Sequence, residues 1–275
     1  MTTEKLFKVN GVELWAETFG DAADPAVLLI HGASASMLWW ETAFCAKLAA
    51  RGRYVIRYDQ RDTGRSTTYP VGEPPYAMSD LAADAIGLLD ALGVERAHVV
   101  AQSMSGGTGL HLGVDHASRV ASLTFVSTTT GDDELPPPSD DFPRFSTPDF
   151  GDSAAVEEYV VRAIEAESAG VFDEAAARVL VRSDIARATN FEASLTNHYA
   201  MKFDGPQGGG FGELTMPVLV VHGSRDPVFP LAHGQALRDA VPGGKLVVIE
   251  GAGHGIPEPL WEPFLAALVE QTDAR

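Results

Sequence analysis

Three residues of the types that cooperate in nucleophilic catalysis each follow a predicted strand. Ser103 comes after "HVVAQ", Asp226 after "VLVVHGSR" and His254 after "LVVIEGAG". A serine hydroxyl is a weak nucleophile, so it needs a base to take its proton and a third group to orient that base. The chain order Ser, Asp, His therefore predicts Ser103 as nucleophile, His254 as base and Asp226 as the acid that orients the imidazole.

The segment around Ser103, "AQSMSGG", has the layout of a nucleophile elbow, in which a strand turns sharply at the nucleophile and continues as a helix. The usual pattern is G-x-S-x-G, and here Ala101 and Ser105 replace the two glycines. Both side chains are small, so we expect a crowded turn that still places Ser103 at its tip, and we expect Ser105 to tolerate replacement by glycine. The backbone N–H of Met104 would then stand at the start of the helix, where it can face an oxyanion.

Other residues compete for the same roles. Asp132 and Asp133 follow the strand predicted over residues 120–127, and they are the alternative to Asp226 as the acid. Both lie several residues beyond that strand, which favours Asp226. His198 and His233 are the remaining alternatives to His254 as the base.

We expect substrate contacts from Ser34, Trp40 and Tyr199. The stretch "GASAS" (32–36) also fits a serine pattern, but Ser34 lies in a loop ahead of a helix and not at a strand-to-helix turn. We therefore interpret Ser34 as a loop-shaping residue that contacts substrate. Trp40 and Tyr199 belong to two aromatic-rich regions that we expect to face each other across a cleft, which would make the cleft apolar.

Short β-branched runs alternate with longer amphipathic stretches, which predicts a mostly parallel sheet with helices on both faces. The chain opens with a hairpin turned at Asn10-Gly11, a strong two-residue turn signal. A helix is predicted over residues 78–94, with Ser79 as its N-cap and Gly93 as its stop. The predicted strands after the hairpin are 25–32, 54–60, 96–103, 120–127, 216–223 and 245–251.

One segment interrupts this alternation. Residues 131–213, which we call the lid segment, begin with a proline-rich acidic stretch, continue as two helical stretches and end in "DGPQGGGFGEL". Proline and glycine clusters at both ends predict an inserted helical lid between two strands of the sheet. The predicted core then consists of residues 1–130 and 214–275.

Taken together, these stretches resemble the α/β-hydrolase superfamily over nearly the whole chain. The motifs that carry the resemblance are "LLIHGASAS", "RYDQRDTGRS", "HVVAQSMSGG", "VLVVHGSRDPVFP" and "GAGHG". The start of the chain and "RYDQRDTGRSTT" more narrowly resemble the aclacinomycin methylesterase-like branch of actinobacterial hydrolases. The resemblance implies an α/β-hydrolase fold, and it implies a second oxyanion donor, the backbone N–H of Ala33, beside that of Met104.

Composition excludes several other classes of protein. The chain has 275 residues and a formal charge of −18, which makes nucleic acid and anionic membrane surfaces poor partners. Its only cysteine, Cys45, lies in an apolar stretch and is expected to be buried. No metal-ligand spacing and no dinucleotide-binding pattern is present, so we expect neither metal nor cofactor. With no signal peptide and no membrane-spanning run, we expect a cytoplasmic monomer or small homo-oligomer.

The charged stretch "RYDQRDTGRS" lacks the glycine-rich cradle and the lysine of a phosphate-binding loop. We therefore expect Arg57, Asp59, Arg61 and Asp62 to form a structural network of ion pairs and turns.

The sequence as a whole favours a serine hydrolase that cleaves a carboxylic ester of an apolar or aromatic small molecule through an acyl-enzyme. A secondary metabolite is one such substrate. Two alternatives stay open at this point. One is a cofactor-free enzyme of another reaction class, such as a lyase, an oxygenase or a carbon-carbon bond-forming enzyme, because fold does not dictate reaction. The other is a ligand-binding protein without turnover.

Overall fold

The computed structural model describes residues 4–273 and is built around an eight-stranded sheet with strand order β1-β2-β4-β3-β5-β6-β7-β8. β1 pairs with β2 and β2 with β4 in antiparallel fashion, and all other pairs are parallel. The strands are β1 Lys5–Val9, β2 Val12–Phe19, β3 Ala26–Ile30, β4 Tyr54–Tyr58, β5 Ala97–Gln102, β6 Val120–Val126, β7 Val218–Gly223 and β8 Lys245–Ile249. This is the predicted α/β-hydrolase sheet.

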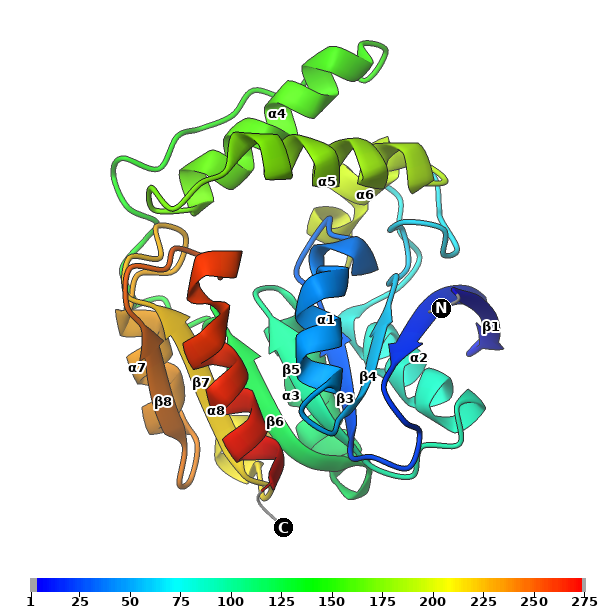
Figure 1. Cartoon of the computed structure of the whole chain (residues 1–275), viewed down its shortest axis with the longest axis vertical. Coiled ribbons are helices and arrows are strands. Elements are labelled where there is room, and N and C mark those ends of the chain that lie inside the picture. Colours follow the sequence, from blue (N-terminus) through cyan, green and yellow to red (C-terminus); the bar gives the residue numbers. More distant parts are fainter. Residues whose placement is uncertain (1–3, 274–275) are drawn as a thin grey trace.

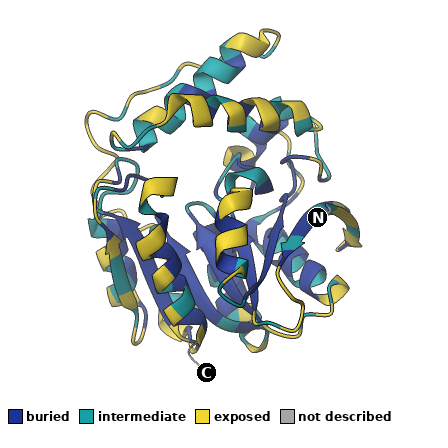
Figure 2. Cartoon of the chain, viewed as in Figure 1, coloured by how far each residue is buried: buried dark blue, intermediate teal, exposed yellow. Residues whose placement is uncertain are grey.

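Helices cover both faces of the sheet (Figure 1). Helices α1 (Thr42–Ala49) and α8 (Trp261–Asp273) pack on one face, and α2 (Met78–Ala91), α3 (Ser105–Asp115) and α7 (Ala232–Ala240) pack on the other. Figure 2 shows the sheet buried between helices whose outer sides are exposed. Burial on both faces explains why the central strands have apolar side chains at nearly every position.

Most of the predicted element boundaries agree with the structure to within a few residues. Asn10 and Gly11 both have positive φ, 47° and 76°, as the two-residue hairpin turn requires. Gly93, with φ of 71°, follows the end of α2. The N-cap prediction was wrong, because α2 begins one residue before Ser79. The Ser79 hydroxyl instead donates to Asp204 Oδ2 at 2.7 Å.

Three helices, α4 (Ser153–Glu167), α5 (Glu174–Arg187) and α6 (Phe191–Ala200), lie between β6 and β7 and form a layer above the carboxyl ends of the strands (Figure 1). They confirm the inserted helical segment, whereas its outer limits at 131 and 213 stay a prediction. Short 3-10 helices complete the described elements: Met37–Trp39, Ala117–Arg119, Phe211–Glu213 and Glu258–Leu260.

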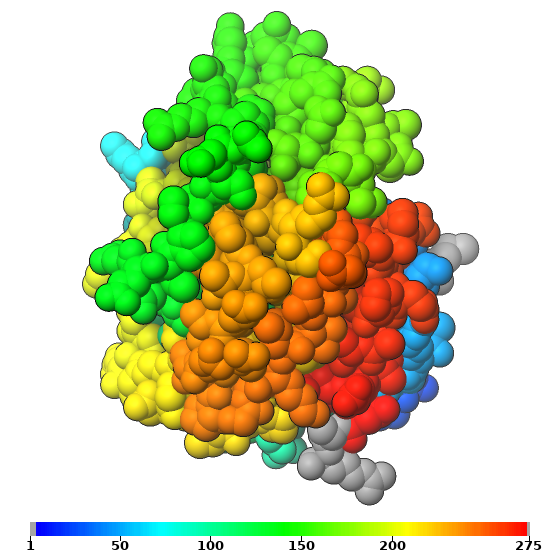
Figure 3. All heavy atoms as spheres, turned by 90° about the vertical axis from the view of Figure 1, so that its left-hand side faces the viewer, coloured from blue at the N-terminus to red at the C-terminus, as the bar shows by residue number. Residues whose placement is uncertain are grey.

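The proline-rich start of the lid segment is bound to the surface of the core. Figure 3 shows it in green beside the orange atoms of α7. The Ser139 N–H donates to the Pro227 carbonyl at 2.8 Å, and His233 Nε2 lies 2.8 Å from the Pro136 carbonyl oxygen. These contacts supply backbone partners to a stretch that has no secondary structure of its own.

The charged stretch forms a structural network, as predicted, but its partners come from other elements. Arg57 pairs with Glu17, and Arg61 binds Asp84 through Nε at 2.6 Å and Nη2 at 2.8 Å. Asp59 Oδ2 lies 2.6 Å from Arg187 Nη1 at the end of α5.

Hydrogen bonds join the same stretch to the lid segment. The Thr189 N–H donates to the Gly64 carbonyl at 2.7 Å, and the Ser194 hydroxyl donates to the Asp62 carbonyl at 2.6 Å. The ends of α5 and α6 are therefore bound to the core through this charged stretch.

Within residues 4–273, no helix is both long enough and apolar enough to cross a membrane.

The Arg61–Asp84 pair gives a prediction about stability. Both side chains are buried, with 7% and 2% exposure, so Asp84→Ala leaves a buried guanidinium without its partner. We expect the free energy of unfolding to fall by about 3 kcal/mol. In the control, Asp239→Ala removes an exposed partner of Arg238 and should cost less than about 1 kcal/mol. Chemical denaturation measures both, and equal losses would contradict the prediction.

Candidate active site

Ser103, His254 and Asp226 form a hydrogen-bonded chain at the carboxyl ends of the strands. Ser103 Oγ lies 2.9 Å from His254 Nε2, and His254 Nδ1 lies 2.9 Å from Asp226 Oδ2. Ser103 follows β5 directly, has a φ of 51° and precedes α3. The structure thus brings the three predicted residues together, with the strand-to-helix turn at Ser103 that an elbow requires.

Asp226 lies in the loop after β7, where backbone groups hold its carboxylate. Its Oδ1 accepts the N–H groups of Val228 and Phe229, both at 2.9 Å. Burial alone would raise the pKa of Asp226. The hydrogen bonds that its carboxylate accepts from the His254 ring and from the Phe229 N–H outweigh burial, so the pKa of Asp226 lies below the usual value. The alternative acids Asp132 and Asp133 are exposed, in the stretch after β6.

His254 is buried and faces a pair of opposing effects on its pKa. Burial lowers the pKa, but the hydrogen bond to Asp226 and the charges of Asp226 and Glu167 outweigh it, so the pKa lies above the usual 6.5. The hydrogen bond to Asp226 therefore favours the imidazolium, the form that His254 must take when it accepts a proton.

The loop that carries His254 rests on the end of α4. The His254 N–H donates to the Glu167 carbonyl at 2.9 Å. A methyl group on Gly253 would lie 2.0 Å from that carbonyl oxygen, so only glycine allows this approach. The lid segment therefore contributes to the placement of the imidazole.

The loop after β3 lies directly over Ser103, since a methyl group on Gly32 would come within 2.9 Å of Ser103 Cβ. The backbone N–H groups of Ala33 and Met104 donate to no other group within residues 4–273, and both residues are only half-buried. Two free donors beside the serine are what stabilisation of an oxyanion requires.

Ser105 and Gln60 bind this loop, a role that the sequence did not indicate. The Ser105 hydroxyl donates to the His31 carbonyl at 2.5 Å, and Gln60 Nε2 donates to the same oxygen at 2.9 Å. Ser105 is thus more than a small replacement for glycine. The other replacement, Ala101, has its methyl group next to Gly109 of α3, where an added methyl would lie 2.9 Å from Ala101 Cβ. The missing side chain at Gly109 makes room for the extra one at Ala101.

His198, one of the alternatives to His254, lies away from Ser103 Oγ and has a structural role that the sequence did not indicate. It lies on α6 and is fully buried. Its Nδ1 accepts the N–H of Ser34 at 3.1 Å, and its Nε2 donates to the Arg61 carbonyl at 2.9 Å. Burial lowers its pKa, so the ring stays neutral and can accept and donate at once. It holds Ser34 in a left-handed conformation, with a φ of 66°, next to Ala33.

The three predicted substrate contacts have different surroundings. Trp40 is only 5% exposed and packs against Phe44 and Phe264, with ring centroids at 5.6 Å and 6.4 Å. The prediction that Trp40 faces the cleft was wrong, because it belongs to the core. Its neighbour Trp39 faces the lid segment instead, where its indole N–H donates to Asp184 at 2.7 Å.

Tyr199 and Ser34 lie side by side. Tyr199 is 70% exposed. Its phenol lies beside the Ser34 hydroxyl. That hydroxyl is buried and has no hydrogen-bond partner within residues 4–273. Tyr199 also lines an open hollow of about 210 Å³ together with Thr147, Pro148, Phe150, Tyr159, Leu195 and Thr196.

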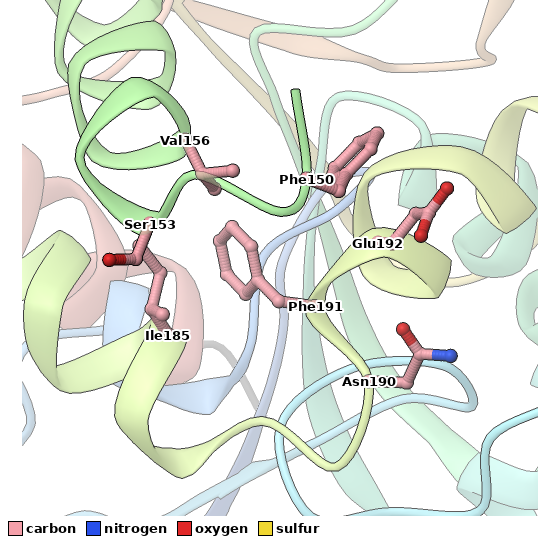
Figure 4. A pocket seen from close by; sticks show the side chains of 7 residues that line it. All are labelled: Phe150, Ser153, Val156, Ile185, Asn190, Phe191 and Glu192. Atoms are coloured by element: carbon pink, nitrogen blue, oxygen red, sulfur yellow. The ribbon is translucent and has the colours of Figure 1, made fainter. Parts of the chain in front are cut away.

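A second hollow, of about 230 Å³, lies within the lid segment (Figure 4). Phe191 projects between the side chains of Val156 and Ile185, and Phe150 lies on its other side. Ser103 lines neither hollow. Aromatic side chains line both hollows together with polar ones.

Residues 4–273 contain no group of three or more His, Cys, Asp or Glu side chains placed to hold a metal ion. Cys45 is buried, as expected.

Comparison with known proteins agrees with this geometry. Residues 25–164 match the model of the alpha/beta hydrolase fold family, and residues 202–259 match a family described as TAP-like protein. The chain belongs to the α/β-hydrolase family. It is 33% identical to rhodomycin D methylesterase DauP of Streptomyces sp. (strain C5), over 100% of this chain and 99% of that protein.

A second methylesterase gives the same result. Rhodomycin D methylesterase DnrP of Streptomyces peucetius is 33% identical over 96% of each chain. The two relatives confirm the narrower resemblance to the branch of actinobacterial methylesterases.

Solved structures match in fold. An esterase from Exiguobacterium antarcticum matches with a TM-score of 0.78 and 21% identity, over 99% of this hydrolase and 100% of that chain. The 2-hydroxy-6-oxo-6-phenylhexa-2,4-dienoate hydrolase of a Rhodococcus species has the same TM-score at 22% identity, over 100% and 99%. At these identities the likeness concerns the fold alone.

The raised pKa of His254 predicts the acid limb of the pH profile. His254 must be neutral to accept a proton, so kcat/KM for ester hydrolysis should fall as the pH drops through a value above 6.5, while Asp226 stays ionised. Asp226→Asn removes the main group that raises this pKa. We expect the limb to move to lower pH and kcat to fall about 10⁴-fold. Initial rates between about pH 5 and pH 9 test this. An unmoved limb in Asp226→Asn would contradict it.

The approach of Gly253 to Glu167 gives a matched pair of variants. In Gly253→Ala the new methyl group collides with backbone, so the His254 loop must shift. A displacement of about 1 Å can cost about 100-fold in rate, and we expect a loss of that order. Gly255→Ala, two residues on, meets nothing within 4 Å and should stay within about twofold of the parent. The rate at which a fluorophosphonate labels Ser103 measures both; similar rates would refute the role of this contact.

Proposed function

We propose that this enzyme hydrolyses the methyl ester of a polycyclic aromatic secondary metabolite, using Ser103 as the nucleophile. The observation that carries the proposal is the geometry around one atom. Ser103 Oγ lies 2.9 Å from His254 Nε2 and beside two backbone N–H groups without partners in the described chain. Nucleophile, base and oxyanion donors therefore meet at one point.

The proposed reaction proceeds in two halves. Ser103 Oγ attacks the ester carbonyl carbon as its proton passes to His254 Nε2, and the resulting oxyanion accepts the N–H groups of Ala33 and Met104. His254 then gives the proton to the departing methoxide, which leaves as methanol, and an acyl-enzyme on Ser103 remains. A water molecule gives a proton to His254 and attacks the acyl carbon, and the proton returns to Ser103 as the carboxylic acid leaves.

Asp226 supports both halves without changing its own protonation. Its lowered pKa keeps it ionised, and its bond to His254 Nδ1 fixes the tautomer in which Nε2 is free to accept a proton. It also stabilises the imidazolium that forms in each half.

The chain is a carboxylic ester hydrolase, and two observations support the substrate class. The full-length relatives DauP and DnrP act on the methyl ester of rhodomycin D. The lid segment presents aromatic side chains, including Phe150, Tyr159 and Tyr199, around an open hollow. Aromatic walls suit a flat polycyclic substrate, which buries its faces against them.

A fluorophosphonate should label Ser103 in the folded protein and not in Ser103→Ala. With an aromatic methyl ester as substrate, Ser103→Ala should lose about 10⁶-fold in kcat. The parent should prefer that ester over a short nitrophenyl ester, a lactone and a carbamate of similar size.

Other outcomes would overturn parts of the proposal. Full activity in Ser103→Ala would show chemistry without a covalent nucleophile, as expected of a lyase or oxygenase on this scaffold. A ligand that binds stoichiometrically and is recovered unchanged would show a binding protein. Preference for the carbamate would move the substrate class away from esters.

A further inference from the structure

His222 is a buried histidine near the end of β7 that the proposed reaction does not use. Its side chain has no exposed surface. Its Nε2 lies 2.7 Å from the Phe229 carbonyl oxygen and 3.4 Å from Asp226 Oδ2. Its Nδ1 is also buried and has no hydrogen-bond partner in the part of the chain that the structure describes, residues 4–273. The ring therefore makes its polar contacts through one nitrogen only.

These surroundings fix the tautomer of His222. A carbonyl oxygen and an ionised carboxylate oxygen both accept hydrogen bonds, so Nε2 must carry the proton. Burial lowers the pKa of His222, which keeps the ring neutral and leaves Nδ1 without a proton. His222 is thus a single N–H donor to the Phe229 carbonyl, with Asp226 as a more distant second acceptor.

Phe229 connects this donor to the three residues of the proposed triad. Its carbonyl accepts from His222, and its N–H donates to Asp226 Oδ1 at 2.9 Å. Its ring meets the ring of His254 edge to face, with centroids 5.5 Å apart, and packs against His233 at 5.2 Å. One hydrogen bond from His222 therefore holds a residue that contacts both the acid and the base.

The packing around His222 makes its unpaired nitrogen informative. A methyl group added to Gly234 of α7 would lie 2.8 Å from both Cγ and Nδ1 of the ring, so the helix backbone lies directly against it. A buried nitrogen without a partner destabilises the folded state, and an apolar side chain of similar size would avoid that cost. The presence of an imidazole is explained if a donor at Nε2 is needed in this position.

We propose that His222 is a positioning residue of the proposed triad, whose Nε2–H holds Phe229 and thereby the carboxylate of Asp226. The inference rests on the proposed function, because Asp226 and His254 are taken to be the acid and the base. Asp226 Oδ1 is held by backbone N–H groups of the 226–229 loop, while Oδ2 lies 2.9 Å from His254 Nδ1. Without the bond to the Phe229 carbonyl the loop can relax, and Asp226 then no longer fixes the tautomer and direction of the His254 ring.

Two replacements of His222 separate the hydrogen-bond donor from the bulk of the ring. The amide nitrogen of glutamine is as many bonds from the backbone as Nε2 of histidine, so His222→Gln keeps a donor for the Phe229 carbonyl. The amide nitrogen of asparagine corresponds to Nδ1, so His222→Asn loses that bond. The control is His98→Asn, because His98 is also buried but lies near the start of β5, at the opposite end of that strand from Ser103. Chemical denaturation checks that each variant is folded.

We expect His222→Asn to lower kcat for an aromatic methyl ester about 100-fold with little change in KM, because a displaced acid disturbs the reacting geometry and not substrate binding. His222→Gln should recover most of that loss. His98→Asn should keep the kcat of the parent, although it is less stable. An unchanged kcat in His222→Asn, or equal losses in the Asn and Gln variants of His222, would overturn the proposal, since the Nε2 donor would then have no part in catalysis.

Nuclear magnetic resonance tests the same contact in the parent protein, which matters if His222→Asn does not fold. The ring nitrogen resonances of His222 should show a neutral imidazole with its proton on Nε2, and a proton on Nδ1 would contradict the proposal. In His222→Asn the low-field proton resonance of His254 Nδ1–H should shift or disappear, an effect that lower stability alone does not produce. If the parent hydrolyses no ester, the proposed function fails, whereas these resonances still test whether His222 positions Asp226.

Discussion

The left-handed backbone at Ser103 is the constraint on which the rest of the site depends. A φ of 51° in a residue with a side chain costs on the order of 1 to 3 kcal/mol, and surrounding bonds must hold it. The Ser103 N–H donates to the Val126 carbonyl at 2.9 Å, and its own carbonyl accepts the Thr128 hydroxyl at 2.7 Å and the Gly106 N–H at 2.9 Å. With the turn fixed beside β6, the hydroxyl is directed at His254 Nε2, and the Met104 N–H has no partner among residues 4–273.

The lid segment is part of the catalytic framework as well as its cover. Its three helices each fix a different part of the core: α4 supports the His254 loop through Glu167, α5 pairs Arg187 with Asp59, and α6 holds the Ser34 loop through His198. Because the proposed base and the proposed oxyanion loop both depend on these contacts, any movement of the lid segment would alter the geometry of the site together with access to the cleft.

The pKa of His254 is shifted in the opposite direction from the pKa values of the other buried histidines around the site. Burial lowers the pKa of His31 to about 3 and also lowers the pKa values of His198 and His222, so these rings are neutral at pH 7. His254 is just as buried, but Asp226 reverses the direction of its shift. Among these four histidines, only His254 has its pKa raised, and the hydrogen bond to Asp226 is the main reason. The neutral rings serve as fixed donors and acceptors.

The sequence by itself determined the elements and the order of the triad, because both depend on local patterns. Apolar runs predict buried strands, Asn10-Gly11 predicts the hairpin turn, and a serine, an aspartate and a histidine that follow parallel strands must meet at one edge of the sheet. Only the tertiary structure decided which of Trp39 and Trp40 faces the lid segment, and that Ser105 and His198 bind the loop over Ser103. These contacts join residues distant along the chain, such as His198 and Ser34, which are 164 positions apart. No local pattern carries that information, because the packing of helices against loops selects the partners only when the whole core is formed.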